Sequence, residues 1–379
     1  MKILIITNSY PSEQNKYNNS FVHSRAKLYI ENNVETVVYV YDNTRKNNLE
    51  YIYEGIKVII ATKNELVEKL EKDNYDKIII HFAMKEMTKL ILNHNLNHKP
   101  IVIWVHGYEA LHWKRRLFNL SFSIRSILIF LKYMIHNISQ IRFFKSLIRE
   151  SNKKNIHFVF VSEWMKNITE KDTKSIIYNS NYSIIPNPIN DLIFYNENKE
   201  SSDRLNVFSL RPYDTRKYAN DIVVKTIIQL SKKPFFKEYT FNLYGKGRLF
   251  RKTTRKLERF DNVKIIEGFY TQTEIKKLHQ QNGIIFIPTR QDSQGVSMCE
   301  GISSGLVPIT SFNTAIPEFV SEDYGFLVKG NQIKEFVKIF ENIYYNKNIY
   351  LNKQKQTKIL TERLGNEKIL KEELKLINE

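Results

Sequence analysis

Two carboxylates and a glycine occur close together directly after a short apolar run. Asp292 and Glu300 are separated by seven residues, and Gly295 lies between them. The preceding run, residues 284–287, is apolar throughout and predicts a buried strand of a parallel sheet, whose carboxyl end is the usual place for a ligand. A glycine that opens a helix there would expose backbone amides and the positive end of the helix dipole. This stretch therefore predicts a phosphate site over residues 295–297.

Three cations occur near the end of another predicted strand. Arg211 directly follows the apolar run 205–210. Arg216 and Lys217 then open the helix that we expect to contain residues 223–230. Arginine can bind a phosphate through two parallel hydrogen bonds, and lysine adds a point charge. Together these cations could clamp a diphosphate.

The first of these regions resembles the E-x7-E region of the retaining GT-B glycosyltransferases of family four, the glycosyl transferases group 1, especially those that make capsule and O-antigen polysaccharides. The likeness includes the spacing of the two acids and the segments 305–308 (GLVP) and 315–318 (AIPE). In that family the first acid contacts the donor sugar and the second binds the nucleotide ribose. The resemblance implies these roles for Asp292 and Glu300, although this chain has aspartate where the family has glutamate.

A histidine and two glycines at predicted strand ends extend the resemblance. His106 follows the apolar run 101–105 and stands beside a glycine, so its side chain could reach a ligand. It is similar to a family histidine near the donor sugar. Gly245 lies in a glycine-rich turn after a strand, which alone is weak evidence for a nucleotide. Gly268 lies in a segment that borders the base pocket in the family.

The cationic segment is also similar to the family, in which an arginine and a lysine neutralise the leaving diphosphate. Glycine commonly follows that lysine, but this chain has Tyr218, so the choice between Arg216 and Lys217 as the main clamp stays open. The resemblance implies catalytic roles for Asp292, His106, Arg211 and Lys217, and donor-binding roles for Arg216, Gly245, Gly268, Gly295, Val296, Ser297 and Glu300. No metal ligands are predicted, since no D-x-D triplet occurs and no second ligand stands at a useful spacing from His106.

The length of the chain predicts the number of domains, and the alternation of strands with helices predicts the fold class that positions these residues. A chain of 379 residues exceeds the usual single core, so we expect two domains. The fold class is α/β, with the resemblance implying GT-B, in which two Rossmann-like domains face a central crevice. Residues 1–195 are expected to form an acceptor-binding domain and residues 204–345 a nucleotide-sugar-binding domain, with a linker at 196–203. A helical tail, residues 346–379, is expected to pack back on the first domain.

The charge calls for an anionic partner, because the net charge is +18. Residues 112–154 contain ten Lys and Arg residues interleaved with aromatic and aliphatic ones, and Glu150 is their only acid. Such helices can lie in a membrane interface. They can equally be ordinary surface helices with solvated cations, and RNA binding is a third reading without an RNA-binding signature. No apolar run is long enough to span a bilayer, and the single cysteine fits a reducing cytoplasm.

These observations predict a retaining, metal-independent glycosyltransferase of the hexosyltransferase type. It would move a sugar from a nucleotide-diphosphate sugar, by family frequency a UDP-sugar, to a lipid-linked or polysaccharide acceptor in bacterial surface polysaccharide biosynthesis. No cofactor is expected. We expect a cytoplasmic location, and peripheral association at the inner face of the membrane stays an open alternative. The alternatives are a nucleotide-sugar 2-epimerase with the same architecture, and a non-catalytic nucleotide-sugar-binding or membrane scaffold protein.

Overall fold

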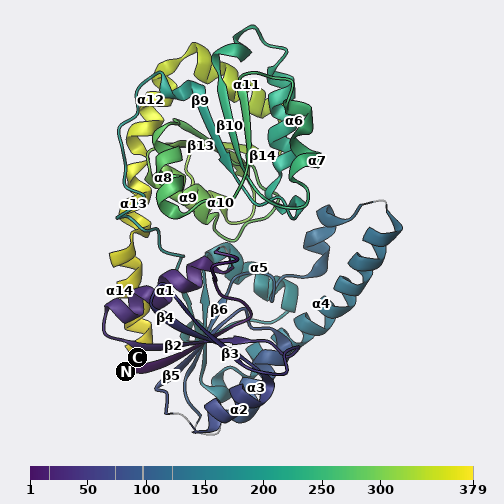
Figure 1. The fold of residues 1–379 in the computed structure, drawn as a ribbon, viewed down its shortest axis with the longest axis vertical. Helices are drawn as coiled ribbons and strands as arrows, with labels where there is room; N and C mark the ends of the chain where they lie inside the picture. The colour runs from purple at the N-terminus through teal and green to yellow at the C-terminus, as the bar shows by residue number, and fades with distance from the viewer. Residues whose placement is uncertain (17, 73, 96–97, 122, 379) are drawn as a thin grey trace. The chain divides into compact units, whose positions relative to one another are not determined.

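The computed structural model describes residues 1–16, 18–72, 74–95, 98–121 and 123–378. These residues form two compact units (Figure 1). The first comprises residues 1–115, 121–186 and 370–379, and the second comprises residues 116–120 and 187–369. The polar run 196–203, expected as a linker, belongs to the second unit, and the last ten residues of the expected tail belong to the first.

The first unit is built on an eight-stranded sheet in the order β3-β4-β2-β1-β5-β6-β7-β8. All neighbouring strands are parallel except β3 and β4, which form an antiparallel hairpin at one edge. The strands are β1 (Lys2–Thr7), β2 (Glu35–Tyr41), β3 (Leu49–Tyr53), β4 (Ile56–Ala61), β5 (Lys77–His81), β6 (Ile101–Val105), β7 (Ile156–Phe160) and β8 (Tyr182–Ile184).

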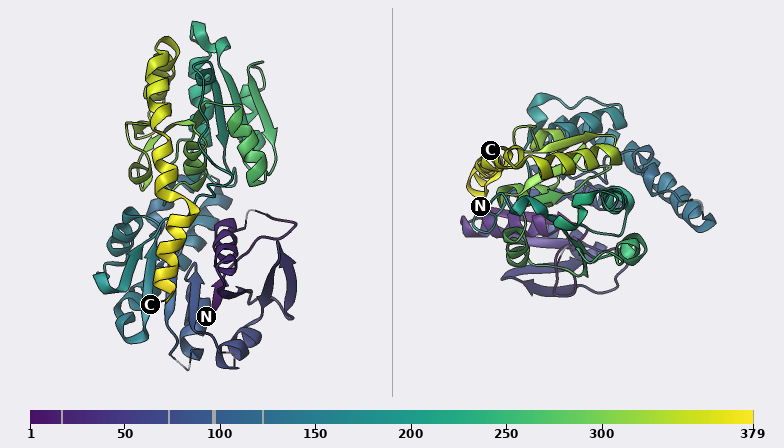
Figure 2. Two further views of the ribbon diagram at one scale, coloured as in Figure 1. Left: turned by 90° about the vertical axis from the view of Figure 1, so that its left-hand side faces the viewer. Right: turned by 90° about the horizontal axis from the view of Figure 1, so that it is seen from above.

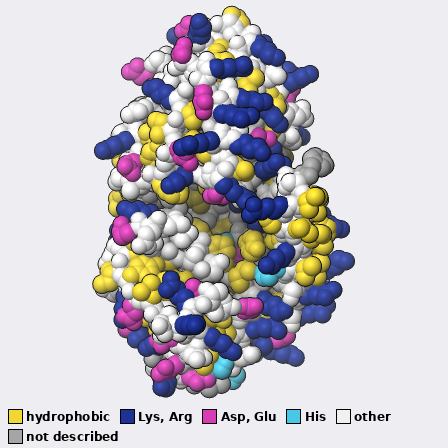
Figure 3. All heavy atoms as spheres, turned by 45° about the vertical axis from the view of Figure 1, so that its right-hand side comes forward, with side chains coloured by type: hydrophobic (Ala, Val, Ile, Leu, Met, Phe, Trp, Pro, Cys, Tyr) yellow, Lys and Arg dark blue, Asp and Glu magenta, His cyan; other side chains and the backbone are white. Residues whose placement is uncertain are grey.

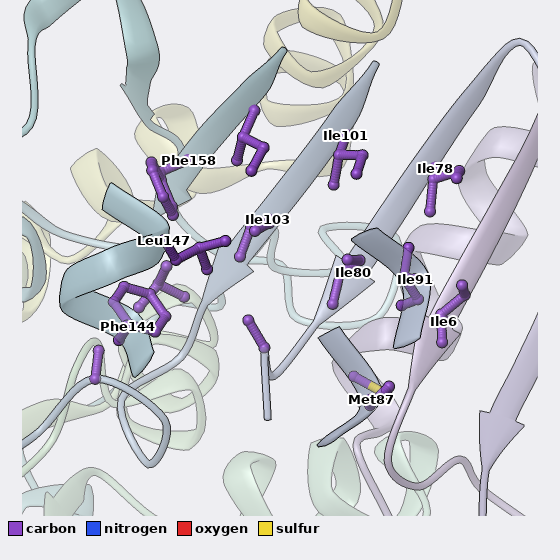
Figure 4. Close-up of a cluster of buried hydrophobic side chains, with 14 of the residues drawn as sticks. Ile6, Ile78, Ile80, Met87, Ile91, Ile101, Ile103, Phe144, Leu147 and Phe158 are labelled. Atoms are coloured by element: carbon purple, nitrogen blue, oxygen red, sulfur yellow. The ribbon is translucent and has the colours of Figure 1, made fainter. Parts of the chain in front are cut away.

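The central strands of this sheet are apolar on both faces, because helices cover both sides of a parallel sheet. Every residue of β5 and β6 is buried. Figure 4 shows Ile78, Ile80, Ile101 and Ile103 from these two strands packed into one cluster with Phe144 and Leu147. The helices of the unit are α1 (Ser20–Glu31), α2 (Lys63–Lys72), α3 (Lys85–His94), α4 (Ile124–Glu150), α5 (Glu163–Thr173) and most of α14 (Asn366–Asn378).

The C-terminal helix α14 lies against α1 (Figures 1 and 2). The buried guanidinium of Arg25 donates to Glu373 Oε1 at 2.9 Å, and Tyr29 Oη donates to Glu373 Oε2 at 2.6 Å. The same guanidinium carbon lies 3.8 Å from the centre of the Trp104 ring, within cation–π range. Without α14 the buried Arg25 would lose its carboxylate partner, so this ion pair holds α14 against α1.

The second unit is built on a six-stranded parallel sheet in the order β11-β10-β9-β12-β13-β14. Its strands are β9 (Asn206–Leu210), β10 (Thr240–Gly245), β11 (Val263–Glu267), β12 (Ile284–Phe286), β13 (Val307–Phe312) and β14 (Phe326–Lys329). Its helices are α6 (Asn220–Leu230), α7 (Phe250–Thr254), α8 (Gln272–Gln280), α9 (Val296–Ser303), α10 (Ile316–Phe319), α11 (Ile333–Tyr345), α12 (Lys347–Gln356) and α13 (Lys358–Leu364). Both units therefore have the Rossmann-like α/β architecture predicted from the sequence.

The start of one predicted helix is wrong. Arg216 and Lys217 do not open α6; they lie in a separate 3-10 turn, Arg216–Tyr218. Ala219 follows with φ of 49°, in the left-handed region, and α6 begins only at Asn220. A left-handed residue breaks the run of helical backbone, so the two cations stand on a turn ahead of the helix. Within the described residues, none of the helices has the length and apolar content needed to cross a membrane.

Candidate functional site

The order of strands in the second sheet locates a binding edge. From β9 the chain proceeds through β10 to β11 in one direction, and from β12 it proceeds through β13 to β14 in the other. The switch point therefore lies between β9 and β12, where α/β proteins bind ligands at the carboxyl ends of the strands. Arg211 directly follows β9, and the segment that contains Asp292 and Gly295 follows β12. The topology thus brings together Arg211 and Asp292, which lie 81 positions apart in the sequence.

Arg211 is the central cation of this edge. Its Nη1 donates to Ser297 Oγ at 3.3 Å and lies 3.6 Å from Asp292 Oδ2. The side chain is buried, and burial lowers the pKa of the guanidinium, although Asp292 opposes that shift. The Nε and Nη2 atoms have no hydrogen-bond partner among the residues described. A buried cation with unpaired donors is costly, so this position favours an additional anion.

The turn before α9 presents the backbone of the predicted phosphate site. Gly295 has φ of 81° and ψ of 54°, a left-handed conformation that glycine adopts without strain, and it caps α9. Its amide donates to Asp292 Oδ1 at 3.0 Å, and its carbonyl accepts from Met298 and Cys299. Val296 and Ser297 are the first two residues of α9. Their backbone amides have no acceptor carbonyl one turn earlier in the helix. Their amides are therefore placed to bind an anion beside Arg211.

Asp292 also has a structural role that the sequence did not reveal. One of its carboxylate oxygens accepts from the Gly295 amide, and the other faces Arg211. Its own amide donates to Thr314 Oγ1 at 3.1 Å, which joins the turn to the segment after β13. The carboxylate is therefore held in one orientation at the start of α9.

Glu300 lies on α9 with its side chain buried. Burial raises the pKa of its carboxyl to about 8, and a hydrogen bond from Gln272 at the start of α8 opposes that shift. At neutral pH the carboxyl is therefore mostly protonated in the ligand-free chain. A protonated carboxyl can both donate and accept, which suits a partner with hydroxyl groups.

The turn that carries Arg216 and Lys217 is fixed by a third arginine. Arg290, which follows β12, makes a bidentate pair with Asp221 at 2.7 and 2.8 Å. Its amide donates to the Lys217 carbonyl at 2.8 Å, and Nη1 donates to the Arg216 carbonyl at 2.7 Å. Although burial opposes it, the pair with Arg290 lowers the pKa of Asp221. Arg290 thus fixes the turn by donating hydrogen bonds to the carbonyls of Arg216 and Lys217.

The two cations of that turn differ in their partners. Arg216 Nη1 donates to the carbonyl of Leu120, which belongs to the same unit, at 3.4 Å. Lys217 Nζ lies 5.1 Å from the centre of the Tyr218 ring, and it has no hydrogen bond or ion pair with any residue that the structure describes. The same ring lies 5.2 Å from the Arg211 guanidinium carbon. Tyr218 therefore joins Lys217 to Arg211, a contact that the sequence did not indicate.

Two of the three predicted donor-binding glycines, Gly245 and Gly268, lie side by side at neighbouring strand ends. Gly268 donates its amide to the Gly245 carbonyl at 2.9 Å. Gly245 has φ of 144°, and a Cβ on it would lie 2.0 Å from the carbonyl oxygen of Arg211. Glycine is therefore required at position 245, because the carbonyl oxygen of Arg211 leaves no room for a Cβ there. Its effect on a ligand is indirect, through the position of Arg211.

His106 belongs to the first unit and follows β6, as predicted. Its Nε2 lies 3.0 Å from Nδ1 of His81, the last residue of the neighbouring strand β5. Its ring also packs against Phe21 and Phe82, with centroid distances of 4.7 and 4.6 Å. Burial, aided by Arg25, lowers the pKa of His106 well below its ordinary value of 6.5. The imidazole is therefore neutral at physiological pH.

Sequence reasoning missed His81, Tyr218 and Gln272. A histidine that ends a mostly apolar strand was the available signal for His81, since that strand pairs with β6, which His106 follows. No local pattern pointed to the other two. The part of the chain that is described contains no group of three or more His, Cys, Asp or Glu side chains that could hold a metal ion.

Comparisons with known proteins support the interpretation of the second unit. Residues 199–359 match the family model described as glycosyl transferases group 1. A comparison of the sequence with curated proteins found no significant match.

Solved structures resemble the whole chain. Anabaena HepE, in complex with UDP and glucose, aligns with a TM-score of 0.71 at 13% identity, over 100% of this chain and 99% of that one. Sucrose-phosphate synthase from Thermosynechococcus elongatus aligns with a TM-score of 0.72 at 12% identity, over 100% and 98%. WaaG, a glycosyltransferase involved in lipopolysaccharide biosynthesis, aligns with a TM-score of 0.68 at 10% identity, over 96% and 95%. The chain has the GT-B fold of these structures, and its second unit carries the match to the glycosyl transferases group 1.

Proposed function

We propose that the protein is a glycosyltransferase whose second unit binds a nucleoside-diphosphate sugar, specifically a UDP-sugar. The observation that carries the proposal is the buried guanidinium of Arg211, with two nitrogens unpaired among the described residues, at the start of α9. A diphosphate there would supply the missing acceptors and meet the amides of Val296 and Ser297. The family match over residues 199–359 and the UDP in the HepE structure support the same ligand class.

The arrangement is suited to stabilising a leaving diphosphate. When the bond between the anomeric carbon and the phosphate oxygen breaks, its electron pair stays on that oxygen as negative charge. Arg211, Lys217 and the first amides of α9 are fixed before the reaction begins, so they stabilise this charge without reorganisation. These cations belong to the protein, and we propose that transfer proceeds without an added divalent ion.

We infer a retaining transfer for the same site. The acceptor oxygen forms its bond to the anomeric carbon on the face from which the diphosphate departs, and the acceptor proton passes to the departing phosphate oxygen. Asp292, oriented by the Gly295 amide and Arg211, contacts the sugar. The role of His106, in the first unit, stays a prediction from the family resemblance. The acceptor we propose is a lipid-linked saccharide or polysaccharide of the bacterial surface, a role supported by the likeness to WaaG.

Calorimetry with UDP, GDP and CMP in the presence of a chelator tests the donor assignment. We expect saturable binding of UDP alone, and a loss on the order of 100-fold in affinity for Arg211→Met, because a buried charge-assisted contact is removed. Arg255→Met, which removes an exposed arginine from the same unit, is the matched control and should bind as the wild type does. Equal binding by the Arg211 variant, or no binding of any nucleotide, would refute the site.

Product analysis then tests the reaction. Incubation with a UDP-sugar and lipid-linked saccharide acceptors should give a new glycoside whose anomeric proton coupling matches that of the donor. An inverted product would disprove retention. Conversion of the UDP-sugar to its C2 epimer, in the absence of any acceptor, would instead identify a 2-epimerase.

A further inference from the structure

Helix α4 of the first unit presents an apolar face to solvent. Its N-terminal half extends away from the sheet of that unit (Figure 1). Five large aliphatic residues recur at helical spacing along this half, which places them within about 100° of one another around the helix axis. We call them the α4 apolar face: Ile124 (78% exposed), Ile127 (41%), Leu128 (61%), Leu131 (43%) and Ile135 (67%). A helix of a globular protein normally turns such a face toward the core.

The C-terminal half of α4 is docked on its own unit by buried apolar residues, among them Phe144 and Leu147, and by two buried amides. Asn137 donates to the Leu111 carbonyl at 2.9 Å and accepts from the Trp113 amide at 2.7 Å. Gln140 donates to the carbonyls of Ala83 and Glu109 and accepts from the Lys85 amide. Specific hydrogen bonds therefore hold the helix against its own unit and fix which side faces outward. The exposure of the aliphatic side chains follows from this docking.

The sequence segment that contains the α4 apolar face carries basic residues but no acidic ones. No Asp or Glu occurs between Glu109 and Glu150, a segment that contains eight Lys and Arg residues. Arg125 and Lys132 flank the α4 apolar face on one side of the helix, and both are exposed. Figure 3 shows hydrophobic side chains gathered at the right-hand edge beside a group of Lys and Arg side chains. Phe122, also in the basic region predicted from the sequence, lies outside the described residues.

We propose that the α4 apolar face binds the surface of an anionic lipid bilayer. The helix would lie in the plane of the interface, with its aliphatic side chains among the acyl chains and with Arg125 and Lys132 at the phosphate level. Spanning is not involved, since α4 does not meet the requirements for crossing a bilayer. A second copy of the chain fits less well, because an isologous contact would gather two sets of cations around one apolar strip with no acid from this segment to neutralise them.

Sedimentation of the full-length protein with vesicles tests this proposal without any nucleotide, so its outcome does not depend on the proposed reaction. The wild type should bind vesicles of phosphatidylcholine and phosphatidylglycerol more tightly than phosphatidylcholine alone, and less tightly at high salt. Ile124→Ser/Leu128→Ser/Ile135→Ser should reduce the partition coefficient on the order of 100-fold. Arg125→Gln/Lys132→Gln should reduce it on the order of 10-fold, and only for the anionic vesicles.

Matched controls separate the face from general effects of substitution. Ile52→Ser/Ile176→Ser/Leu192→Ser replaces three aliphatic residues of similar exposure outside α4, and Arg255→Gln/Lys256→Gln replaces an exposed Arg and Lys in the second unit. Both should bind vesicles as the wild type does, and all variants should keep the wild-type circular dichroism spectrum. A wild type that stays in the supernatant, or serine variants of α4 that bind normally, would overturn the proposal. So would a dimer that the α4 serine variant abolishes in the absence of vesicle binding, which would identify a self-association surface.

Discussion

Arg211 Nη1 lies 3.3 Å from Ser297 Oγ, and this contact joins the end of β9 to the first turn of α9. Parallel pairing of β9 with β12 makes it possible, because the carboxyl ends of both strands reach the same edge of the sheet. The buried cation and the helix dipole therefore act on the same small volume. An anion bound there would contact the guanidinium and the positive end of the helix dipole. Among the described residues, two nitrogens of Arg211 have no hydrogen-bond partner.

The different partners of the neighbouring cations predict unequal effects on nucleotide binding. Lys217→Gln should weaken UDP binding about 10-fold, because its ammonium has no competing polar partner among the described residues. Arg216→Gln should change the affinity by less than about 3-fold, because its guanidinium already donates to the Leu120 carbonyl. Titration calorimetry of both variants at one ionic strength makes the comparison. Equal losses, or a larger loss for Arg216→Gln, would assign the clamp to arginine instead.

Glu300 predicts an unusual dependence of stability on pH. Burial raises the pKa of its carboxyl to about 8 in the folded chain, against an ordinary value of 4.5. Between these values the folded state holds a proton that the unfolded state releases, so this group makes the protein less stable as the pH rises from 4.5 to 8. Glu300→Gln resembles the protonated form and removes that loss. We expect its Tm to exceed that of the wild type by about 3 °C at pH 8, with little difference at pH 5.

Thermal unfolding followed by circular dichroism at the two pH values measures this effect. Glu258→Gln, which replaces an exposed carboxylate of the same unit, serves as the control and should leave the difference between the two pH values unchanged. A lower Tm for Glu300→Gln than for the wild type at pH 8 would show that the buried carboxyl does not cause this loss of stability.

The parts of the site that could be predicted are local in sequence. The apolar run 284–287 and the glycine at 295 sufficed to place β12, the turn and α9, because burial and a left-handed residue both leave signals in adjacent positions. The contacts of Tyr218 with Arg211 and of His81 with His106 depend on strand order, which no local pattern contains. The helix after β9 was expected several residues too early because its apolar spacing defines the face of α6 but not its first residue.

The close approach at Gly245 predicts a large and specific effect of adding one methyl group. Gly245→Ala would place a Cβ 2.0 Å from the Arg211 carbonyl oxygen, so the backbone would have to move at a cost of more than about 3 kcal/mol. Gly330→Ala is the matched control, since it also has positive φ but meets no atom within 4 Å, and it should cost about 1 kcal/mol. Urea unfolding gives both values. Similar costs for the two variants would show that the crowding at Gly245 is relieved easily.

The paired histidines of the first unit predict a loss of stability in mild acid. Burial lowers the pKa of both His81 and His106 well below 6.5, and their mutual repulsion when charged adds to the shift of His81. The unfolded chain takes up protons below pH 6.5 that the folded chain does not, so stability is complete above that pH and falls as the pH decreases. At pH 5.5 each histidine should account for on the order of 1 kcal/mol of this loss.

His81→Gln keeps a hydrogen-bonding group beside His106 but cannot titrate. The fall in stability between pH 7.5 and pH 5.5 should therefore shrink by the share of one histidine, while His106 and the buried His279 keep theirs. Urea unfolding at the two pH values measures the fall, with His136→Gln, an exposed histidine on α4, as the variant that should behave as the wild type. If His81→Gln kept the full dependence on pH, the protons would have to be taken up elsewhere, and the neutral state of the pair would lose its support.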